Sequence, residues 1–382
     1  MAKRILITLW YADGLHGGVV YASEIGRYFH SLGYDVYLAG VSINQKTRSF
    51  FADSHVDAFD IENLPLDVCY DIVWAHHFPI LPYLVSKGLK YKRILNSIIS
   101  SILPIETPIF FHENIDLITV LTDGMKQRFC RKYDLPRDKV FVLPNTAPDE
   151  FFNVDKKCND KIGSLAVVSN HPPKELSKAV RLLRKRGIKT AVYGGRNSVR
   201  ITPELLSQHD VIVSIGKTVQ YALAAGIPIY NYDHFGGSGY ITLKNIETEH
   251  NSNFSGRSFF TKKSAEQIAD EIMDGYGSAA RQSGKLKLIA EQRYRSSRIM
   301  PRVLERLLER PEKEKIIIAG KNKLFFEYCR CICDKAVREY SRYYKQKRKL
   351  VCFLCNLIFF NKSLRRKTRN KYGYMLNKHF AK

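Results

Sequence analysis

Three glycine-rich segments have the composition of phosphate-binding loops, and each follows a short apolar run. They are residues 14–18 (GLHGG), 194–196 (GGR) and 236–239 (GGSG). Glycine lets the backbone approach an anion closely, and an adjoining helix N-terminus stabilises negative charge. These segments predict a site for a ligand that carries phosphate. The alternative is that each glycine only allows a tight turn between two elements.

A diphosphate ligand also needs positive charge. Lys174, Arg196 and Lys217 each follow a predicted strand, so they are the candidate cations. The segment 215–218 (IGKT) resembles the end of a P-loop, but that motif requires glycine where the chain has Val211. No two aspartates are separated by a single residue anywhere in the sequence. We therefore expect a site without a metal ion or cofactor.

Histidine is the residue type best suited to act as a base, because its pKa lies near the working pH. His76 and His77 follow the apolar run 71–75, which is typical of a buried strand. Adjacent residues at a strand end point in opposite directions, so at most one of them faces a substrate, and we favour His76. His16, in the first glycine segment, is the second candidate. Either histidine can instead have a purely structural role.

Apolar runs alternate with helical patterns through most of the first 310 residues, as in proteins with a parallel sheet covered on both faces. A polar stretch at 153–161 (NVDKKCNDK) separates two similar halves. We predict two Rossmann-like α/β domains that face each other across a cleft, with ligands at the carboxyl ends of the strands. The predicted strands are Lys3–Leu9, Asp35–Val41, Asp71–Ala75, Leu117–Thr122 and Lys139–Leu143, then Ser164–Ser169, Thr190–Tyr193, Val211–Ile215 and Ile227–Tyr232.

Several passages occur in an order and spacing that are similar to those of one enzyme family. They are Gly17-Gly18 with the helix behind them, 139–152 (KVFVLPNTAPDEFF) and 216–240 (GKTVQYALAAGIPIYNYDHFGGSGY). Together they resemble the nucleotide-sugar glycosyltransferases of the GT-B fold, family 4 in particular. The passages SNHPPKEL (169–176), YDHFGG (232–237) and NFSGR (253–257) resemble a bacterial subgroup associated with surface polysaccharide assembly.

The resemblance implies an acceptor domain (1–155), a donor domain (162–285), a crossing helix (286–310) and a C-terminal extension (311–382). It also implies retention of anomeric configuration, and a histidine facing the cleft near His76. The donor, a nucleotide-diphosphate sugar, would be bound by Gly17, Gly18, Asn170, Lys174, Arg196, Gly216, Lys217, Thr218, Gln220, His234, Gly236, Gly237, Gly239 and Tyr240.

The chain departs from family 4 at the paired glutamates that the family usually carries with seven residues between them. Gln220 stands at the second position, and the first falls near 211–214 (VIVS). A glutamine can hydrogen-bond a ribose diol but lacks the charge that strengthens such a bond. Either another group contacts the sugar, or the chain is a non-catalytic scaffold of the same fold.

The sequence has 61 basic and 37 acidic residues and a net charge of +24, which favours a polyanionic partner. Residues 311–382 alone hold 20 of the basic and 5 of the acidic residues. The charge therefore lies mostly where no fold signal exists. A nucleic-acid-binding protein is the rival interpretation, but the first 310 residues contain no recognised nucleic-acid module.

Within this extension, the apolar run 350–360 (LVCFLCNLIFF) lies between two basic segments. It is far shorter than the ~20 residues that a membrane-spanning helix needs. We expect the extension to be basic, amphipathic and largely helical, and to bind an anionic membrane surface. The alternatives are a core helix of a small subdomain and, for Cys329, Cys331 and Cys333 with the pair at 352 and 355, a zinc site.

These inferences combine into one expected function. We expect a cytoplasmic glycosyltransferase, peripheral on the inner face of the bacterial membrane. It would move a sugar from a nucleotide diphosphate to a growing cell-surface glycan, such as capsule, lipopolysaccharide or exopolysaccharide. The acceptor would be a glycan or lipid-linked glycan, and no nucleic-acid partner is expected.

Overall fold

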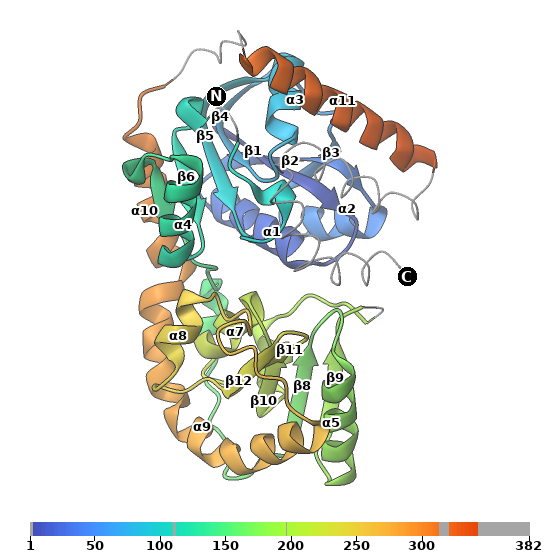
Figure 1. The fold of residues 1–382 in the computed structure, drawn as a ribbon, viewed down its shortest axis with the longest axis vertical. Coiled ribbons are helices and arrows are strands. Elements are labelled where there is room, and N and C mark those ends of the chain that lie inside the picture. Colours follow the sequence, from blue (N-terminus) through green and yellow to red (C-terminus); the bar gives the residue numbers. More distant parts are fainter. Residues whose placement is uncertain (1–2, 110–111, 196, 313–320, 343–382) are drawn as a thin grey trace. The chain divides into compact units, whose positions relative to one another are not determined.

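The computed structural model describes residues 3–109, 112–195, 197–312 and 321–342. These residues divide into two compact units (Figure 1). Unit 1 contains residues 3–14, 22–119 and the described part of 310–342. Unit 2 contains Leu15–Tyr21 and Val120–Glu309. The short segment 15–21, which includes the first pair of glycines, therefore belongs with the second half of the chain.

The first sheet has the order β3-β2-β1-β4-β5-β6-β7, in which β1 pairs in parallel with both β2 and β4. Its strands belong to unit 1 as far as Thr119, and β7 belongs to unit 2. Ile5, Leu6 and Ile7 on β1 are all fully buried, so both faces of this strand are covered. The strands are β1 (Lys3–Ala12), β2 (Tyr34–Ile43), β3 (Asp57–Asp60), β4 (Cys69–Ala75), β5 (Lys90–Ile98), β6 (Leu117–Val120) and β7 (Val140–Val142).

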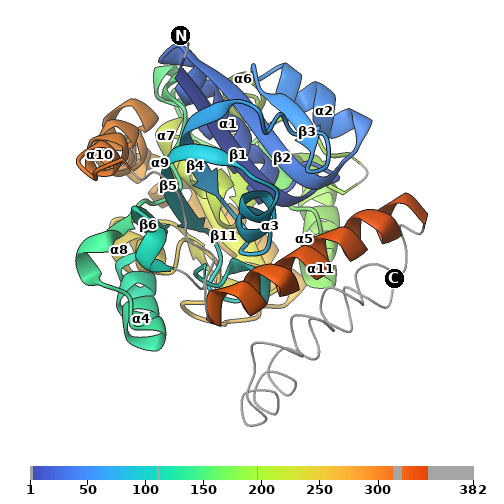
Figure 2. The same ribbon diagram turned by 90° about the horizontal axis from the view of Figure 1, so that it is seen from above.

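The helices of the first half of the chain, with the C-terminal helix, are divided between the two units, because those that follow Val120 and precede Arg310 belong to unit 2. They are α1 (Gly17–Ser31), α2 (Gln45–Ala52), α3 (Ile80–Ser86), α4 (Asp123–Tyr133) and the C-terminal α11 (Lys321–Arg342), with short 3-10 turns η1 (Pro104–Glu106), η2 (His112–Asn114), η3 (Arg137–Lys139) and η4 (Asp149–Asn153). Helix α11 lies beside α3 in both views (Figures 1 and 2). Its Phe325 ring stacks on Phe78, and the Cys333 thiol donates to the carbonyl of Pro79.

Unit 2 is built on a sheet of order β12-β11-β10-β8-β9. Alternate residues of its strands face two separate cores. Leu165 and Val167 pack with α5 and the first half of α9, whereas Ala166 packs with α7 and the second half of α9. The elements are β8 (Ser164–Val168), β9 (Lys189–Tyr193), β10 (Val211–Ser214), β11 (Ile229–Asp233), β12 (Gly236–Tyr240), α5 (Lys174–Lys185), α6 (Pro203–Ser207), α7 (Lys217–Ala224), α8 (Ile246–Asn251), α9 (Ala265–Tyr294) and α10 (Ser296–Leu308).

The strand order of unit 2 contains a topological switch point. The chain runs from β8 to β9 on one side and then returns to β10 on the other side of β8. At such a point two strand ends diverge, and the space beyond them is where ligands bind in open α/β sheets. The segments that follow β8 and β10 are therefore the first place to look for a site.

The prediction of an α/β fold with two Rossmann-like sheets and a helical C-terminal region is confirmed. The second sheet begins at β8, just after the predicted linker, but unit 2 takes in chain from both sides of that linker. The apolar run 350–360 lies outside the described residues. Among the described helices, none combines the length and the apolar character that crossing a membrane requires.

Candidate functional site

Helix α7 begins at the switch point with a glycine in an unusual conformation. Gly216, the N-cap of α7, has φ 62° and ψ −134°, which glycine adopts without strain. No side chain caps the helix, and in its first turn the amide of Val219 donates to the carbonyl of Gly216 at 3.0 Å. A Cβ added to Gly216 would meet no atom within 4 Å, so packing alone does not require this glycine.

Lys217 brings the first glycine segment and α7 together within unit 2. Its ammonium donates to the carbonyl of Thr146 at 2.9 Å and lies 5.3 Å from the ring centre of Tyr21 and 5.4 Å from that of Tyr221. Cation–π contacts of this kind hold a charge in place while leaving it positive. Lys217 therefore sits at the α7 start as a fixed cation.

Gly17, the first residue of α1, also has open space around it, since a Cβ there would meet nothing within 4 Å. Its φ is not in the left-handed region, so its backbone conformation does not require glycine either. Neither internal packing nor conformation explains this residue. A glycine that neither packing nor conformation requires leaves its backbone open to close approach by a ligand. Gly18 and the half-buried His16 flank Gly17 in unit 2.

The loops after β8 and β9 are hydrogen-bonded to each other. Asn170 accepts from the amide of Gly195 at 3.0 Å. Gly194 has φ 138°, and a side chain there would collide with the carbonyl of Ser169, so this glycine has a packing reason. Lys174 is exposed at the first position of α5, which has no side-chain cap. Arg196 lies outside the described residues.

The third glycine segment is not a loop, as the sequence suggested, but strand β12, which pairs antiparallel with β11. Side chains at Gly236 and Gly237 would collide with the carbonyls of Thr261 and Asn231. The amide of Gly237 donates to Thr261 at 3.2 Å, so it is already used inside unit 2. Backbone packing thus accounts for these two glycines without a ligand.

Other predicted donor residues divide between surface and interior. His234 is exposed, and its Nδ1 lies 3.5 Å from Asp233, whose carboxylate accepts from Ser169 at 3.0 Å. Tyr240 points inward and donates to the carbonyl of Ile272 at 2.8 Å, and burial raises its pKa. Gly239 is buried, with φ 81°. Thr218 is half-buried in the first turn of α7.

Gln220 is buried and bonded to its own unit. In one orientation its Nε2 donates to Asn253 Oδ1 at 3.3 Å. In the other, the amide nitrogen donates to the carbonyls of Lys217 (3.0 Å) and Gly216 (2.6 Å). One orientation bonds this side chain to Asn253, and the other bonds it to the backbone at the start of α7. In both orientations Gln220 supports the site through contacts within unit 2.

Asn253 and its neighbours form the part of the site that sequence reasoning missed. Asn253 Oδ1 also accepts from Asn145 at 3.1 Å, and the carbonyl of Phe254 accepts from the amide of Gly216 at 2.8 Å. Both Asn253 and Phe254 have positive φ, 54° and 51°. The sequence signals were the resemblance of the passage 253–257 and the tolerance of asparagine for this conformation, but neither predicted these contacts.

Glu249 was also missed. It is fully buried, and burial raises the pKa of its carboxyl, although the hydroxyls of Ser238, Ser252 and Ser258 partly offset this effect. Its carbonyl accepts from the amide of Phe254 at 2.8 Å. The backbone of Glu249 therefore helps to hold the turn formed by Asn253 and Phe254.

Comparison with solved structures gives the fold. Over about four fifths of this chain, a glycosyltransferase from Rickettsia africae aligns with a TM-score of 0.52 at 14% identity, covering 81% of this chain and 98% of the other. S. aureus TarM aligns at 0.53 and 10% identity (80% and 99% covered). The lipopolysaccharide outer core galactosyltransferase WaaB aligns at 0.51 and 11% identity (80% and 99% covered). The chain has the GT-B glycosyltransferase fold.

At these identities the likeness shows the GT-B fold alone. No protein-family model matches the chain, and no curated protein matches it in sequence. What the GT-B chain does must therefore be argued from its own residues. Membership of family 4 and of its polysaccharide subgroup stays a prediction.

In unit 1, His76 lies directly after β4 and is fully buried. Its Nδ1 lies 3.2 Å from the carbonyl of Ser97, and since a carbonyl can only accept, Nδ1 carries the proton. Burial, with a smaller contribution from His77, lowers the pKa of His76 to about 3. The ring is thus neutral and in one tautomer, but it presents no surface to a substrate, which argues against direct contact.

His77 has φ 58° and is held at both nitrogens. Its Nδ1 accepts from the amide of Trp10 at 2.9 Å, and its Nε2 lies 3.4 Å from the carboxylate of Glu106. His77 therefore joins β1 to the segment after β4. Neither histidine behaves as the free surface residue that the sequence allowed.

Two of the three tail cysteines that the structure describes are buried. Cys329 and Cys333 are buried on α11, and burial raises the pKa of both thiols. Cys331 is exposed on the same helix. In the described part of the chain, no group of three or more His, Cys, Asp or Glu side chains is arranged to hold a metal ion.

Proposed function

We propose that the chain is a glycosyltransferase whose unit 2 binds a nucleotide-diphosphate sugar. The observation that carries this proposal is the pairing of two helix starts, each at a glycine with open space beside it. Lys217 on α7 lies over Tyr21, four residues after Gly17 on α1, so both starts belong to one site. Helix N-termini with accessible backbone amides are suited to phosphate.

The chemistry that such a site supports is departure of a diphosphate. When the bond between the sugar and the diphosphate breaks, negative charge builds on the leaving phosphate. Fixed donors around that charge lower the barrier most. The amides at the α1 and α7 starts would supply them, and the exposed ammonium of Lys174 at the α5 start would add charge.

The remaining details of the proposal rest on resemblance. TarM was crystallised with UDP and α-GlcNAc-glycerol, and WaaB is named for the lipopolysaccharide outer core. We place this chain with enzymes of that kind, acting on a growing bacterial cell-surface glycan. We propose transfer with retention and without a metal ion or other cofactor, with unit 1 contributing the acceptor side.

The base and the location are part of the same proposal. His16 is the better candidate base, because it is half-buried beside Gly17 whereas His76 has no exposed surface. The basic extension after α11 would hold the enzyme at the cytoplasmic face of the membrane.

Donor screening tests the proposal. Purified full-length chain is incubated with a panel of UDP-, GDP-, dTDP- and CMP-sugars, and nucleotide release and binding are both measured. Binding and turnover of one donor supports the enzyme. Binding without turnover in the presence of candidate acceptors supports the scaffold alternative, and no binding of any donor rules out the proposed site.

A further inference from the structure

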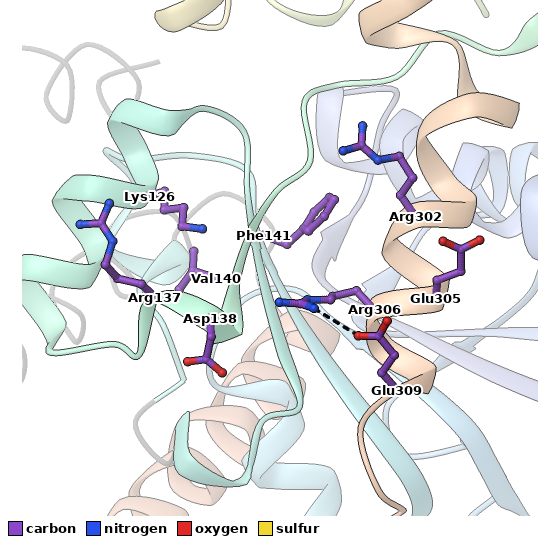
Figure 3. A pocket seen from close by; sticks show the side chains of 9 residues that line it. All are labelled: Lys126, Arg137, Asp138, Val140, Phe141, Arg302, Glu305, Arg306 and Glu309. Atoms are coloured by element: carbon purple, nitrogen blue, oxygen red, sulfur yellow. Dashed lines mark hydrogen bonds and ion pairs between the residues drawn. The ribbon is translucent and has the colours of Figure 1, made fainter.

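A hollow in unit 2 lies between α10 on one side and α4, η3 and β7 on the other (Figure 3). It has a volume of about 360 Å³. Ligand pockets commonly measure ~300–1,000 Å³, so this one suits a small ligand or the head of a larger one. It is lined by Lys126, Arg137, Asp138, Val140, Phe141, Arg302, Glu305, Arg306 and Glu309.

Three of the four cationic side chains that line this hollow lie around Phe141, whereas that of Arg137 extends away from it (Figure 3). In Figure 3, Lys126 and Arg306 extend from opposite sides toward the strand that carries Phe141, and Arg302 ends on the same side of α10 as the Phe141 ring. Glu305 points away from that ring. Charged groups from α4 (Lys126) and α10 (Arg302 and Arg306) thus lie around the ring of Phe141.

Most of this positive charge is not used within the protein. Among the described residues, no carboxylate or hydrogen-bond acceptor pairs with the side chain of Lys126, Arg137 or Arg302. Arg306 has a partner, Glu309, at 3.2 Å, an exposed pair three residues apart on one helix. Such pairs are worth little, so an anion can share Arg306 at small cost.

The chemistry of the lining favours phosphate over a cation or a carboxylate. The hollow is lined by four cationic side chains and three carboxylates, one of which is already bonded to Arg306. The carboxylates do not form a metal-binding group. Three convergent donors, two of them planar guanidinium groups, match the several oxygens of a phosphoryl group better than the two of a carboxylate.

We infer that this hollow binds the phosphate group of a small ester, with the half-buried Phe141 ring against its organic part. Two sources have this chemistry: a soluble glycerol or sugar phosphate, and the headgroup of an anionic phospholipid. The inference does not depend on the proposed donor site, because the two sets of residues are different.

The test compares two variants of the full-length chain with equal loss of charge. Lys126→Gln/Arg302→Gln removes two lining cations, and Arg131→Gln/Arg298→Gln removes two exposed cations of the same helices that do not line the hollow. Glycerol 3-phosphate, inorganic phosphate and acetate are titrated and followed by calorimetry. Vesicles of phosphatidylcholine with and without phosphatidylglycerol are used in co-sedimentation.

We expect the lining variant to lose about tenfold in affinity for glycerol phosphate or for phosphatidylglycerol vesicles, and the control variant to keep it. Binding of the soluble ester identifies the first source, and binding of vesicles alone the second. Both variants keep any phosphate that binds at the starts of α1, α5 or α7, so such binding does not contribute to the difference between them. Equal loss in both variants, acetate bound as tightly as phosphate, or no difference from the unmodified chain overturns the inference.

Discussion

The amide of Gly216 donates to the carbonyl of Phe254 at 2.8 Å, and this bond fixes the start of α7 to a strained turn. Phe254 is fully buried, and both it and Asn253 have positive φ. Each such residue costs ~1–3 kcal/mol and persists only where its surroundings enforce the conformation. Hydrogen bonds to Asn145, Gly216 and Asn231, and to Gln220 in one orientation of its amide, supply that enforcement.

The first prediction concerns this turn. Asn253→Ala should destabilise the chain by about 1–3 kcal/mol, because it removes two side-chain hydrogen bonds and places a less tolerant residue at φ 54°. Asn253→Gly removes the same hydrogen bonds, but glycine adopts positive φ readily. Its loss of unfolding free energy should therefore be smaller than that of Asn253→Ala. Urea unfolding of both variants measures the difference. Equal costs would mean that the backbone conformation contributes nothing.

The fold was predictable from the sequence because it follows from repetition. Buried parallel strands appear in the sequence as short, largely apolar runs such as 211–214, and the helices between them appear as apolar residues at helical spacing. The alternation of the two patterns indicates two α/β units. The helix start at Gly216 was predictable for the same reason, since a glycine follows a strand and precedes a helical pattern.

The contacts of the site were less predictable, since they join distant parts of the chain. Gly17 and Gly236 look alike in sequence, but only the structure shows open space beside one and the Thr261 carbonyl against the other. The position of Asn253, 33 residues from Gln220, leaves no periodic signal. The burial of His76 depends on β1 and β5, which the run 71–75 does not reveal.

The second prediction separates ligand approach from stability at Gly17. Gly17→Ala should stabilise the fold slightly or leave it unchanged, because alanine gains ~0.5–1 kcal/mol over glycine in a helix and nothing lies near the added carbon. The same change should weaken donor binding, because the added methyl group blocks the backbone. Gly284→Ala in α9, which also has open space, is the matched control. Donor affinity equal in both variants would remove Gly17 from the site.

The third prediction concerns the exposed cation at the α5 start. Lys174→Gln should weaken donor binding by a few fold, as expected for an exposed charge that stabilises an anion by ~0.3–1 kcal/mol near a helix terminus. The effect should shrink in high salt. Lys178→Gln, one turn further along the exposed face of α5, should leave affinity unchanged. Calorimetric titration of the nucleotide at two salt concentrations checks this prediction. Equal losses of affinity at both positions would mean that only the overall positive charge of α5 matters, and not the position of Lys174.

The fourth prediction is a pH dependence of stability that originates at His76. A histidine in the unfolded chain takes up a proton near pH 6.5, whereas burial lowers the pKa of folded His76 to about 3. Between these values the unfolded state binds more protons, so stability falls as the pH falls. The slope from this one group is about 1.4 kcal/mol per pH unit.

Replacing His76 removes this slope. His76→Gln should therefore be less stable than the unmodified chain at pH 7.5, and the gap should narrow on acidification to pH 5. Urea unfolding across this range measures the gap, with His171→Gln in an exposed loop as the control for loss of a histidine. A gap that is constant with pH would show that folded His76 takes up a proton as readily as the unfolded chain does.

The last prediction divides the C-terminal extension in two. Phe326, Cys329, Ile332 and Cys333 of α11 are buried, so removing residues 311–382 as a block strips a packed helix from unit 1 as well as the basic segment beyond it. Burial of a large apolar side chain contributes ~1.5–3 kcal/mol. A chain that ends at residue 310 should therefore unfold at a lower temperature.

A chain that ends at Arg342 keeps α11 and should unfold at the same temperature as the full chain, while losing binding to anionic vesicles, since 343–382 hold most of the extension's positive charge. Thermal unfolding and vesicle co-sedimentation on both truncations check the two halves separately. Phe326→Ala in the full chain is the control, because it should lower the unfolding temperature without changing vesicle binding. Full vesicle binding by the chain ending at Arg342 would place the membrane contact elsewhere, with the cationic hollow beside α10 as the next surface to test.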